Sequence, residues 1–259
     1  MRLNYQVVGQ PENTAVVLLH GLFGMSDNLI TLAKMLASEH WVIVPDLINH
    51  GRSPHMANVT YASMAEDVLS LIDSLDIAEC LLLGHSMGGK VSMAMAELAP
   101  DRIKRMIIAD IAPVDYEPRH LDIIEQMQKV KHLNTHKRQE VDDVLAEKVP
   151  EKPLRQFFMK NMARDDEGFW RWRFGLDEIA ASYSAICASP QLTHAFIPPV
   201  LFIIGQQSNY VLPEHKDRIL ALYPNAKVRV VTDAGHWLHA EKPQVFNQIV
   251  YRFFNSILT

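Results

Sequence analysis

The segment Gly-His-Ser-Met-Gly at positions 84–88 constrains the fold of this chain more than any other segment. It follows the apolar run 80–83 and precedes the run 89–99, which is compatible with a helix. A strand, a Gly-x-Ser-x-Gly turn and a helix together form a sharp turn whose serine stands on strained backbone. Glycine is needed on both sides because the backbone passes close to itself and a Cβ would clash. The pattern therefore predicts that Ser86 projects above a central sheet.

Five other short apolar runs predict further strands of this sheet. They occupy residues 15–19, 41–44, 106–109, 200–204 and 228–231. Runs of nearly uniform apolar character are typical of strands that are buried on both faces, whereas a sheet with one wet face would alternate. Helical patterns lie between or after these strands, at residues 29–37, 61–75, 213–222 and 243–258. This alternation predicts an α/β fold, with a mostly parallel central sheet flanked by helices on both faces.

Residues 113–196 interrupt the alternation. Helical patterns dominate this interval and no strong strand run occurs in it, so we expect a helical cap inserted after the strand that ends near Ala109. The chain is thereby divided into a core, residues 1–112 and 197–259, and the cap. Aromatic residues gather in the cap at Phe169, Trp170, Trp172 and Phe174. They are compatible with a small core of the cap, with an apolar wall of a substrate pocket, or with both.

Composition excludes several classes of function. The 259 residues carry a formal net charge of −5, whereas nucleic-acid-binding proteins normally show a strong basic excess. The first residues contain no apolar run long enough for a signal peptide or an anchor, so no membrane span is expected. The two cysteines, Cys80 and Cys187, are too few for a disulfide framework, and we expect a reduced, cytoplasmic setting. Composition predicts no oligomeric state.

A serine hydroxyl is a poor nucleophile at neutral pH and requires an adjacent base. His236 follows Gly235 directly after the last predicted strand, which places it at the same carboxyl edge of the sheet as Ser86. We therefore assign His236 as the base. His239 completes a His-x-x-His pair with it, but no carboxylate-rich helix motif accompanies the pair, so we expect no metal site.

Attack on a carbonyl also requires hydrogen-bond donors where negative charge develops. The Met87 N–H group, in the first turn of the predicted helix, is one such donor. The loop after the first apolar run carries a glycine on each side of Leu22-Phe23, which lets its backbone approach the site closely. We assign the Leu22 N–H group as the second donor, with Phe23 as the alternative. The side chains of Phe23 and Trp237 are expected to contact substrate.

The motifs resemble those of the α/β-hydrolase superfamily. The resemblance is carried, in chain order, by His20-Gly21, Asp46-x-x-x-His50-Gly51-x-Ser53, the turn at 84–88 and Gly235-His236. More narrowly, residues 46–51, 84–90, 110–116 and 235–243 resemble the small bacterial YbfF-type esterases. This resemblance implies hydrolysis of carboxylic esters and acyl-CoA thioesters beneath a small helical cap.

Most members of that superfamily carry the acid of the triad on the loop after the strand that follows the cap. Here that loop, residues 205–211, contains no Asp or Glu, and Ser208 stands where the aspartate is expected. Asp110 ends the preceding strand at the same sheet edge and keeps the chain order serine, acid, histidine. The YbfF-type resemblance also implies this aspartate, and we assign Asp110 as the acid. Weaker candidates are Asp233, Asp115 and Asp46.

These assignments predict a serine hydrolase that transfers an acyl group to water through Ser86, His236 and Asp110, without a cofactor. The resemblance implies that the acyl group comes from a small-molecule ester or acyl-CoA. Basic residues of the cap belong either to a solvated helical surface or to a contact with CoA phosphates; they include Arg119, Lys129, Lys131, Lys152, Arg155, Arg171 and Arg173. A C–C bond hydrolase or a lyase on the same fold is the alternative reaction. A non-catalytic ligand-binding protein is the alternative from another class.

Overall fold

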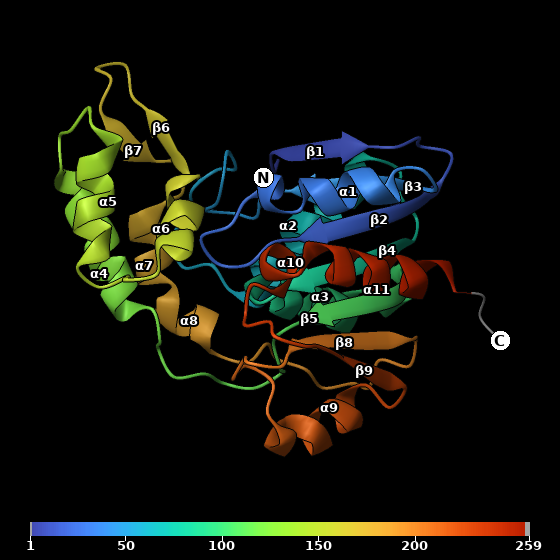
Figure 1. Cartoon of the computed structure of the whole chain (residues 1–259). Coiled ribbons are helices and arrows are strands. Elements are labelled where there is room, and N and C mark those ends of the chain that lie inside the picture. The colour runs from blue at the N-terminus through green and yellow to red at the C-terminus, as the bar shows by residue number, and fades with distance from the viewer. Residues whose placement is uncertain (1, 257–259) are drawn as a thin grey trace.

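A seven-stranded sheet forms the centre of the computed structural model, which describes residues 2–256 (Figure 1). Its strands are β1 (Tyr5–Val8), β2 (Thr14–Leu19), β3 (His40–Pro45), β4 (Cys80–His85), β5 (Ile103–Ala109), β8 (Val200–Gly205) and β9 (Ala226–Val231). Their order is β1-β3-β2-β4-β5-β8-β9, and all neighbouring pairs except β1–β3 are parallel. Each apolar run of the sequence lies within one of these strands, so the predicted mostly parallel sheet is confirmed.

The sequence did not predict β1, the antiparallel strand at one edge. It pairs with β3 in register from Tyr5 opposite Pro45 to Val8 opposite Val42. None of its four residues is buried, and Val7 is 39% exposed. An edge strand of this kind lacks the uniform apolar run that marks the buried strands, because solvent covers part of its surface.

Helices cover both faces of the sheet, as predicted. On one face α1 (Ile30–Leu36) and α11 (Pro243–Asn255) pack on alternate strand residues, among them Val16 and Leu18. On the other face α2 (Tyr61–Ser74) and α3 (Met87–Leu98) pack on the intervening residues, among them Val17 and Leu19. The helix predicted at 243–258 begins at Pro243 as expected, and position 258 lies outside the described residues. Shorter elements are η1 (Ser26–Asn28), η2 (Pro100–Arg102), η3 (Pro213–His215), α9 (Lys216–Leu222) and α10 (Leu238–Glu241).

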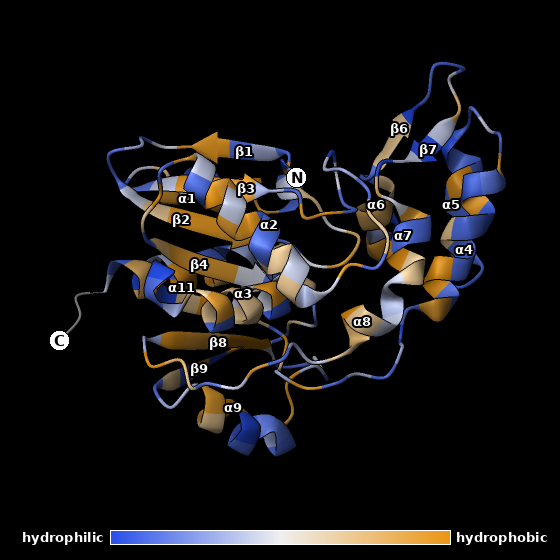
Figure 2. Cartoon of the chain, turned by 180° about the vertical axis from the view of Figure 1, so that it is seen from behind, coloured by the Kyte–Doolittle hydropathy of each residue, from blue (hydrophilic) through white to orange (hydrophobic). Residues whose placement is uncertain are grey.

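Residues 113–196, here called the insertion, lie to one side of the sheet in Figure 1. They form α4 (Leu121–His132), α5 (Arg138–Ala146), α6 (Lys152–Met159), β6 (Met162–Arg164), β7 (Trp170–Trp172), α7 (Leu176–Ala181) and α8 (Tyr183–Cys187). Figure 2 shows the strands β2, β4 and β8 as hydrophobic, whereas α4 and α5 carry hydrophilic residues on their outer side. The sequence did not predict the β6–β7 hairpin, because strands of three residues are too short to show a period.

The aromatic residues of the insertion mainly build its own core. Trp172 stacks on Phe174 with ring centroids 5.0 Å apart, and its Nε1–H donates to Met127 O at 2.9 Å. Trp170 instead packs against the guanidinium groups of Arg138 and Arg164. These residues therefore belong to a small core of the insertion. Other aromatic residues of the insertion line the site described below.

Candidate active site

The turn between β4 and α3 holds Ser86 on strained backbone. Ser86 has a φ of 52° and a ψ of −120°, a conformation that residues other than glycine rarely adopt. A Cβ on Gly84 would lie 2.1 Å from Gly88 O, and a Cβ on Gly88 would lie 2.5 Å from His20 O. The Ser86 N–H group donates to Ala109 O at 2.9 Å, which fixes the turn against β5. Both glycines are therefore required by close backbone approach.

Ser86, His236 and Asp110 lie in one continuous hydrogen-bonded chain. Ser86 Oγ is 2.9 Å from His236 Nε2, and His236 Nδ1 is 2.7 Å from Asp110 Oδ2. The three side chains come from the β4–α3 turn, the loop after β9 and the end of β5. The structure thus brings together the residues that the sequence assigned as nucleophile, base and acid.

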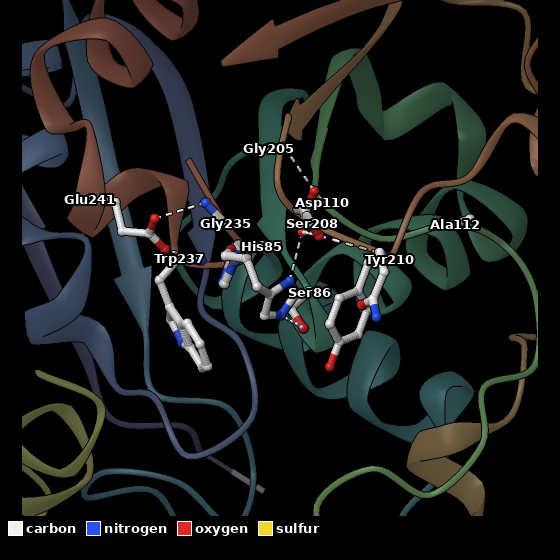
Figure 3. Close-up of polar contacts among 12 residues, drawn as sticks. His85, Ser86, Asp110, Ala112, Gly205, Ser208, Tyr210, Gly235, Trp237 and Glu241 are labelled. Atoms are coloured by element: carbon white, nitrogen blue, oxygen red, sulfur yellow. Dashed lines mark hydrogen bonds and ion pairs between the residues drawn. The ribbon is translucent and has the colours of Figure 1, made fainter. Parts of the chain in front are cut away.

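Asp110 is fully buried, and both of its carboxylate oxygens accept hydrogen bonds (Figure 3). Oδ1 accepts from the Gly205 N–H at 3.0 Å, and Oδ2 accepts from the Ser208 hydroxyl in addition to His236. Because β8 pairs directly with β5, the loop after β8 lies against the end of β5. Ser208, at the position where the superfamily usually has its acid, therefore contacts the acid instead of replacing it.

The weaker acid candidates occupy other places. Asp233 is exposed, and Asp115 is exposed and accepts from the Ser189 N–H at 2.6 Å. Asp46 is buried in a turn, where its carboxylate accepts from the Ser26 and Arg52 N–H groups. Burial alone would raise the pKa of Asp46, but these hydrogen bonds and the nearby His20 lower it overall. Among the residues that the structure describes, none of the three carboxylates bonds to the base.

Leu22 and Met87 both line the cavity that contains Ser86. Within residues 2–256 neither backbone N–H group donates to another protein atom, so both remain available to a ligand. Gly21 makes this approach possible, because a Cβ there would lie only 3.2 Å from the Cβ of Ser86. The two predicted donors are therefore adjacent to the serine.

Phe23, the alternative donor, has a φ of 57° and an almost fully buried side chain. Its ring contacts Phe158 and Phe174 of the insertion at centroid distances of 5.7 Å and 5.6 Å. Its carbonyl oxygen accepts from Nδ2 of the buried Asn161, also in the insertion, at 2.7 Å. The insertion thereby fixes the loop that carries Leu22.

Several contacts hold the loop of His236 in place. The Glu241 carboxylate accepts from the Gly235 N–H at 2.7 Å and from the Trp237 N–H at 3.2 Å (Figure 3). His85 Nε2–H donates to the His236 carbonyl at 2.8 Å. The Tyr210 ring stacks on the His236 ring, with centroids 3.8 Å apart and planes 17° apart. The sequence did not predict the contact of Tyr210, because it depends on how the loop after β8 folds against the loop after β9. It also did not predict the role of Glu241, which lies on α10 directly after the loop of His236.

The cavity has two lobes that meet at Ser86. The first lobe lies next to His236 and is largely aromatic; it is lined by Phe23, Phe157, Phe158, Trp237, His85 and His239, among others. The second lobe lies above α3; it is lined by Tyr61, Lys90, Tyr116, Arg119, Tyr183 and Tyr210, among others. Phe23 and Trp237, which were expected to contact substrate, both belong to the first lobe. The insertion contributes Phe157 and Phe158 to that lobe, and not the aromatics at 169–174.

Uncharged histidines surround His236. Burial and then the neighbouring His236 lower the pKa of His239 to about 4. The same two causes, followed by Arg119, lower the pKa of His120 to about 4. Burial is also the main reason that the pKa of His85 lies well below its usual range. These rings are therefore neutral at pH 7, and they add no positive charge to the site.

Four of the seven basic residues of the insertion that the sequence singled out are paired with carboxylates. Lys131 pairs with Asp177, and Arg155 with Asp142 at 2.9 Å. Lys129 lies 3.5 Å from both Glu125 and Glu147, and Arg171 lies 2.9 Å from Asp165. Of the seven basic residues considered in the sequence, Arg119 alone lines the cavity around Ser86. For Lys129, Lys131, Arg155 and Arg171, the ion pairs account for the charge.

Within the described range 2–256, no three or more His, Cys, Asp or Glu side chains gather as a metal site would require. In that range, every helix is too short or too polar to span a bilayer.

Residues 14–243 match the family model of the alpha/beta hydrolase fold. The chain is 37% identical to esterase YbfF of Escherichia coli (strain K12), an alignment that covers 99% of this chain and all of the relative. It is 36% identical to the sn-1-specific diacylglycerol lipase ABHD11 of Mus musculus, over 97% of this chain and 84% of the relative. A marine microorganism esterase superposes with a TM-score of 0.92 at 33% identity, over 97% of this chain and 99% of that structure.

Proposed function

Since this chain belongs to the α/β-hydrolase fold family and is a hydrolase of the esterase type, we propose that it cleaves carboxylic esters through an acyl-enzyme on Ser86. The observation that carries the proposal is the chain of hydrogen bonds of 2.9 Å and 2.7 Å from Ser86 through His236 to Asp110. This is the arrangement that a serine needs to become nucleophilic at neutral pH.

In the acylation step, Ser86 Oγ attacks the ester carbonyl while His236 Nε2 takes the hydroxyl proton. The carbonyl oxygen gains negative charge, and the Leu22 and Met87 N–H groups stabilise it. Each such donor is worth about 3 kcal/mol in the transition state. The C–O bond to the leaving alcohol then breaks, and the His236 imidazolium gives its proton to that alcohol.

In the deacylation step, water attacks the carbonyl of the acyl-enzyme while His236 takes a proton from the water. The bond to Ser86 Oγ then breaks, and the His236 imidazolium gives that proton to Oγ as the acid product leaves. Asp110 Oδ2 accepts from His236 Nδ1–H throughout both steps. It thereby keeps Nε2 free to accept a proton and stabilises the imidazolium that forms. We propose that the insertion acts as the cap over this reaction, because Phe157 and Phe158 line the first lobe.

Thioesters fall within the same proposal, because the steps at the carbonyl do not depend on whether oxygen or sulfur leaves. Arg119 is the basic residue placed to meet a phosphate of coenzyme A, since it is exposed and lines the second lobe. Hydrolysis of acyl-CoA thioesters is therefore the finer form of the proposed activity.

The test combines a substrate panel with active-site labelling. We expect p-nitrophenyl esters of two to eight carbons to be hydrolysed by the wild-type chain and a fluorophosphonate probe to label Ser86. Ser86→Ala should lose both. Acyl-CoA thioesters of matched acyl length are assayed beside the esters, and their hydrolysis would support the proposed thioesterase activity. Turnover of C–C substrates with no ester hydrolysis would support the alternative reaction, and absence of any covalent adduct would support a binding protein.

A further inference from the structure

Lys90 is a buried cation near the nucleophile that the proposed reaction does not use. It lies on α3, one helical turn after Ser86, and is 1% exposed. Both residues line the second lobe of the cavity. Lysine is almost never buried to this extent without a specific partner, so the position requires an explanation.

The groups in direct contact with the Lys90 ammonium are neutral. Nζ donates to the carbonyl oxygens of Cys187 at 2.9 Å and Ala188 at 2.6 Å. It also lies over the rings of Tyr116 and Tyr61, 4.7 Å and 5.5 Å from their centroids. An ammonium group has three N–H donors, and among the described residues only these two carbonyls accept from it. One donor is therefore available to a ligand, and within residues 2–256 the positive charge is offset only by the longer-range attraction of the exposed Asp115 carboxylate, which makes no ion pair with it.

The rest of the second lobe increases its positive character. Arg119, at the exposed rim, lies over the rings of Tyr116 and Tyr210, and its Nη1 donates to the neutral side chain of Asn209 at 2.8 Å. Glu117 is the single carboxylate among the residues that line this lobe, and it is exposed. Burial lowers the pKa of Lys90 to about 8, so most Lys90 side chains remain charged at pH 7.

We propose that the second lobe binds a carboxylate on the substrate, and that Lys90 is the residue that selects for it. The preferred substrates are then esters that carry a free carboxylate at one end, with Arg119 attracting this group at the rim. The free carboxylate lies on the acyl side in a monoester of a dicarboxylic acid and on the alcohol side in an ester of a hydroxy acid. Both kinds of ester present the same group to Lys90. This inference rests on the proposed ester hydrolysis and adds a substrate class to it.

The first experiment compares two esters of equal length, mono-p-nitrophenyl glutarate and p-nitrophenyl pentanoate. We expect Lys90→Met to lower the ratio of their kcat/KM values by about 10- to 100-fold, the range expected for losing a hydrogen bond to a charged group. Lys34→Met removes the same charge from the exposed face of α1 and should leave the ratio unchanged. If Lys90 only anchors the insertion, both esters lose activity in proportion and the ratio stays constant, which would refute the inference.

A second measurement uses the wild-type chain, so it remains decisive if Lys90→Met does not fold. Glutarate and pentanoate each present one carboxylate to the serine, but glutarate alone carries a second one. We expect glutarate to inhibit hydrolysis of the neutral ester about tenfold more strongly than pentanoate does. Equal inhibition would refute the inference.

Two arms separate the remaining outcomes. Acetyl esters of ω-hydroxy acids, compared with the matched alkyl acetates, show whether the carboxylate is recognised on the alcohol side instead of the acyl side. If the wild-type chain hydrolyses the pentanoate ester without any Lys90-dependent preference in either arm, this inference fails and the proposed function stands. If it hydrolyses no ester and takes no fluorophosphonate, the proposed function itself fails.

Discussion

Replacing Asp110 by asparagine is the sharpest test of the assigned triad. The change keeps the size of the side chain and removes one charge and one acceptor. In the wild-type chain Oδ1 accepts from the Gly205 N–H and Oδ2 accepts from His236 Nδ1–H. An asparagine oxygen satisfies only one of these donors, and its NH2 group then faces the other. Because Asp110 is fully buried, water cannot compensate for the lost bond.

The effect on rate follows from the histidine tautomer. If the asparagine NH2 faces Nδ1, His236 must carry its proton on Nε2, where it can no longer accept a proton from Ser86. The corresponding change in another serine hydrolase lowers kcat about 10⁴-fold. That factor corresponds to about 5.4 kcal/mol of transition-state stabilisation. We expect Asp110→Asn to lower kcat for p-nitrophenyl butyrate by a similar amount.

The assay compares three variants under one condition. Asp233→Asn makes the same chemical change at an exposed site on the His236 loop and should leave kcat close to the wild-type value. Ser208→Ala removes one hydrogen bond to the Asp110 carboxylate and should lower kcat only about two- to tenfold. Circular dichroism confirms that each variant is folded. Near wild-type activity in folded Asp110→Asn, or a larger loss in Ser208→Ala than in Asp110→Asn, would refute the assignment.

Three other outcomes follow from the structure. Gly84→Ala should prevent stable folding, with a loss above about 4 kcal/mol, because its Cβ would lie 2.1 Å from a backbone oxygen; thermal unfolding measures this. Trp237→Ala should raise KM for a hexanoate ester about 5- to 30-fold with little change in kcat, since it removes part of the first-lobe wall. The free energy of unfolding should decrease as pH falls from about 6.5 to about 4. In that range the histidines of the unfolded chain bind protons, whereas His50, His120 and His239 stay neutral in the folded chain because burial lowers the pKa of each. Each ring contributes up to about 1.4 kcal/mol per pH unit, and urea unfolding that shows no change between pH 7 and pH 4.5 would contradict this.

The sequence was sufficient wherever the backbone itself imposes the residue type. The glycines around Ser86 are needed because the turn brings backbone atoms within contact distance, so the turn could be predicted from five residues, and the runs 80–83 and 89–99 predicted the strand and helix on either side. The position of Asp110 could be predicted because parallel strands end at one edge of the sheet, and because the loop 205–211 contains no competing carboxylate. Local rules decide both features.

Features that depend on contacts between distant segments could not be predicted. The stacking of Tyr210 on His236 and the bonds from Lys90 to Cys187 and Ala188 form only when separate loops meet. The edge strand β1 was missed for a related reason, since its place in the sheet is fixed by its partner and not by its own apolar pattern. Periodicity describes one segment at a time, whereas these contacts join residues that are far apart in the sequence.

The bond from Asn161 to the carbonyl of Phe23 limits how this protein can diversify. Insertions are commonly regarded as exchangeable modules that change specificity while the catalytic core stays constant. Here the module also holds the loop that carries an assigned oxyanion donor, so a graft that lacks an equivalent of Asn161 would leave a buried carbonyl unpaired. Exchange of the insertion between relatives should therefore give an active protein only when the transferred insertion contains an equivalent of Asn161. Specificity and catalytic competence are inherited together in this architecture.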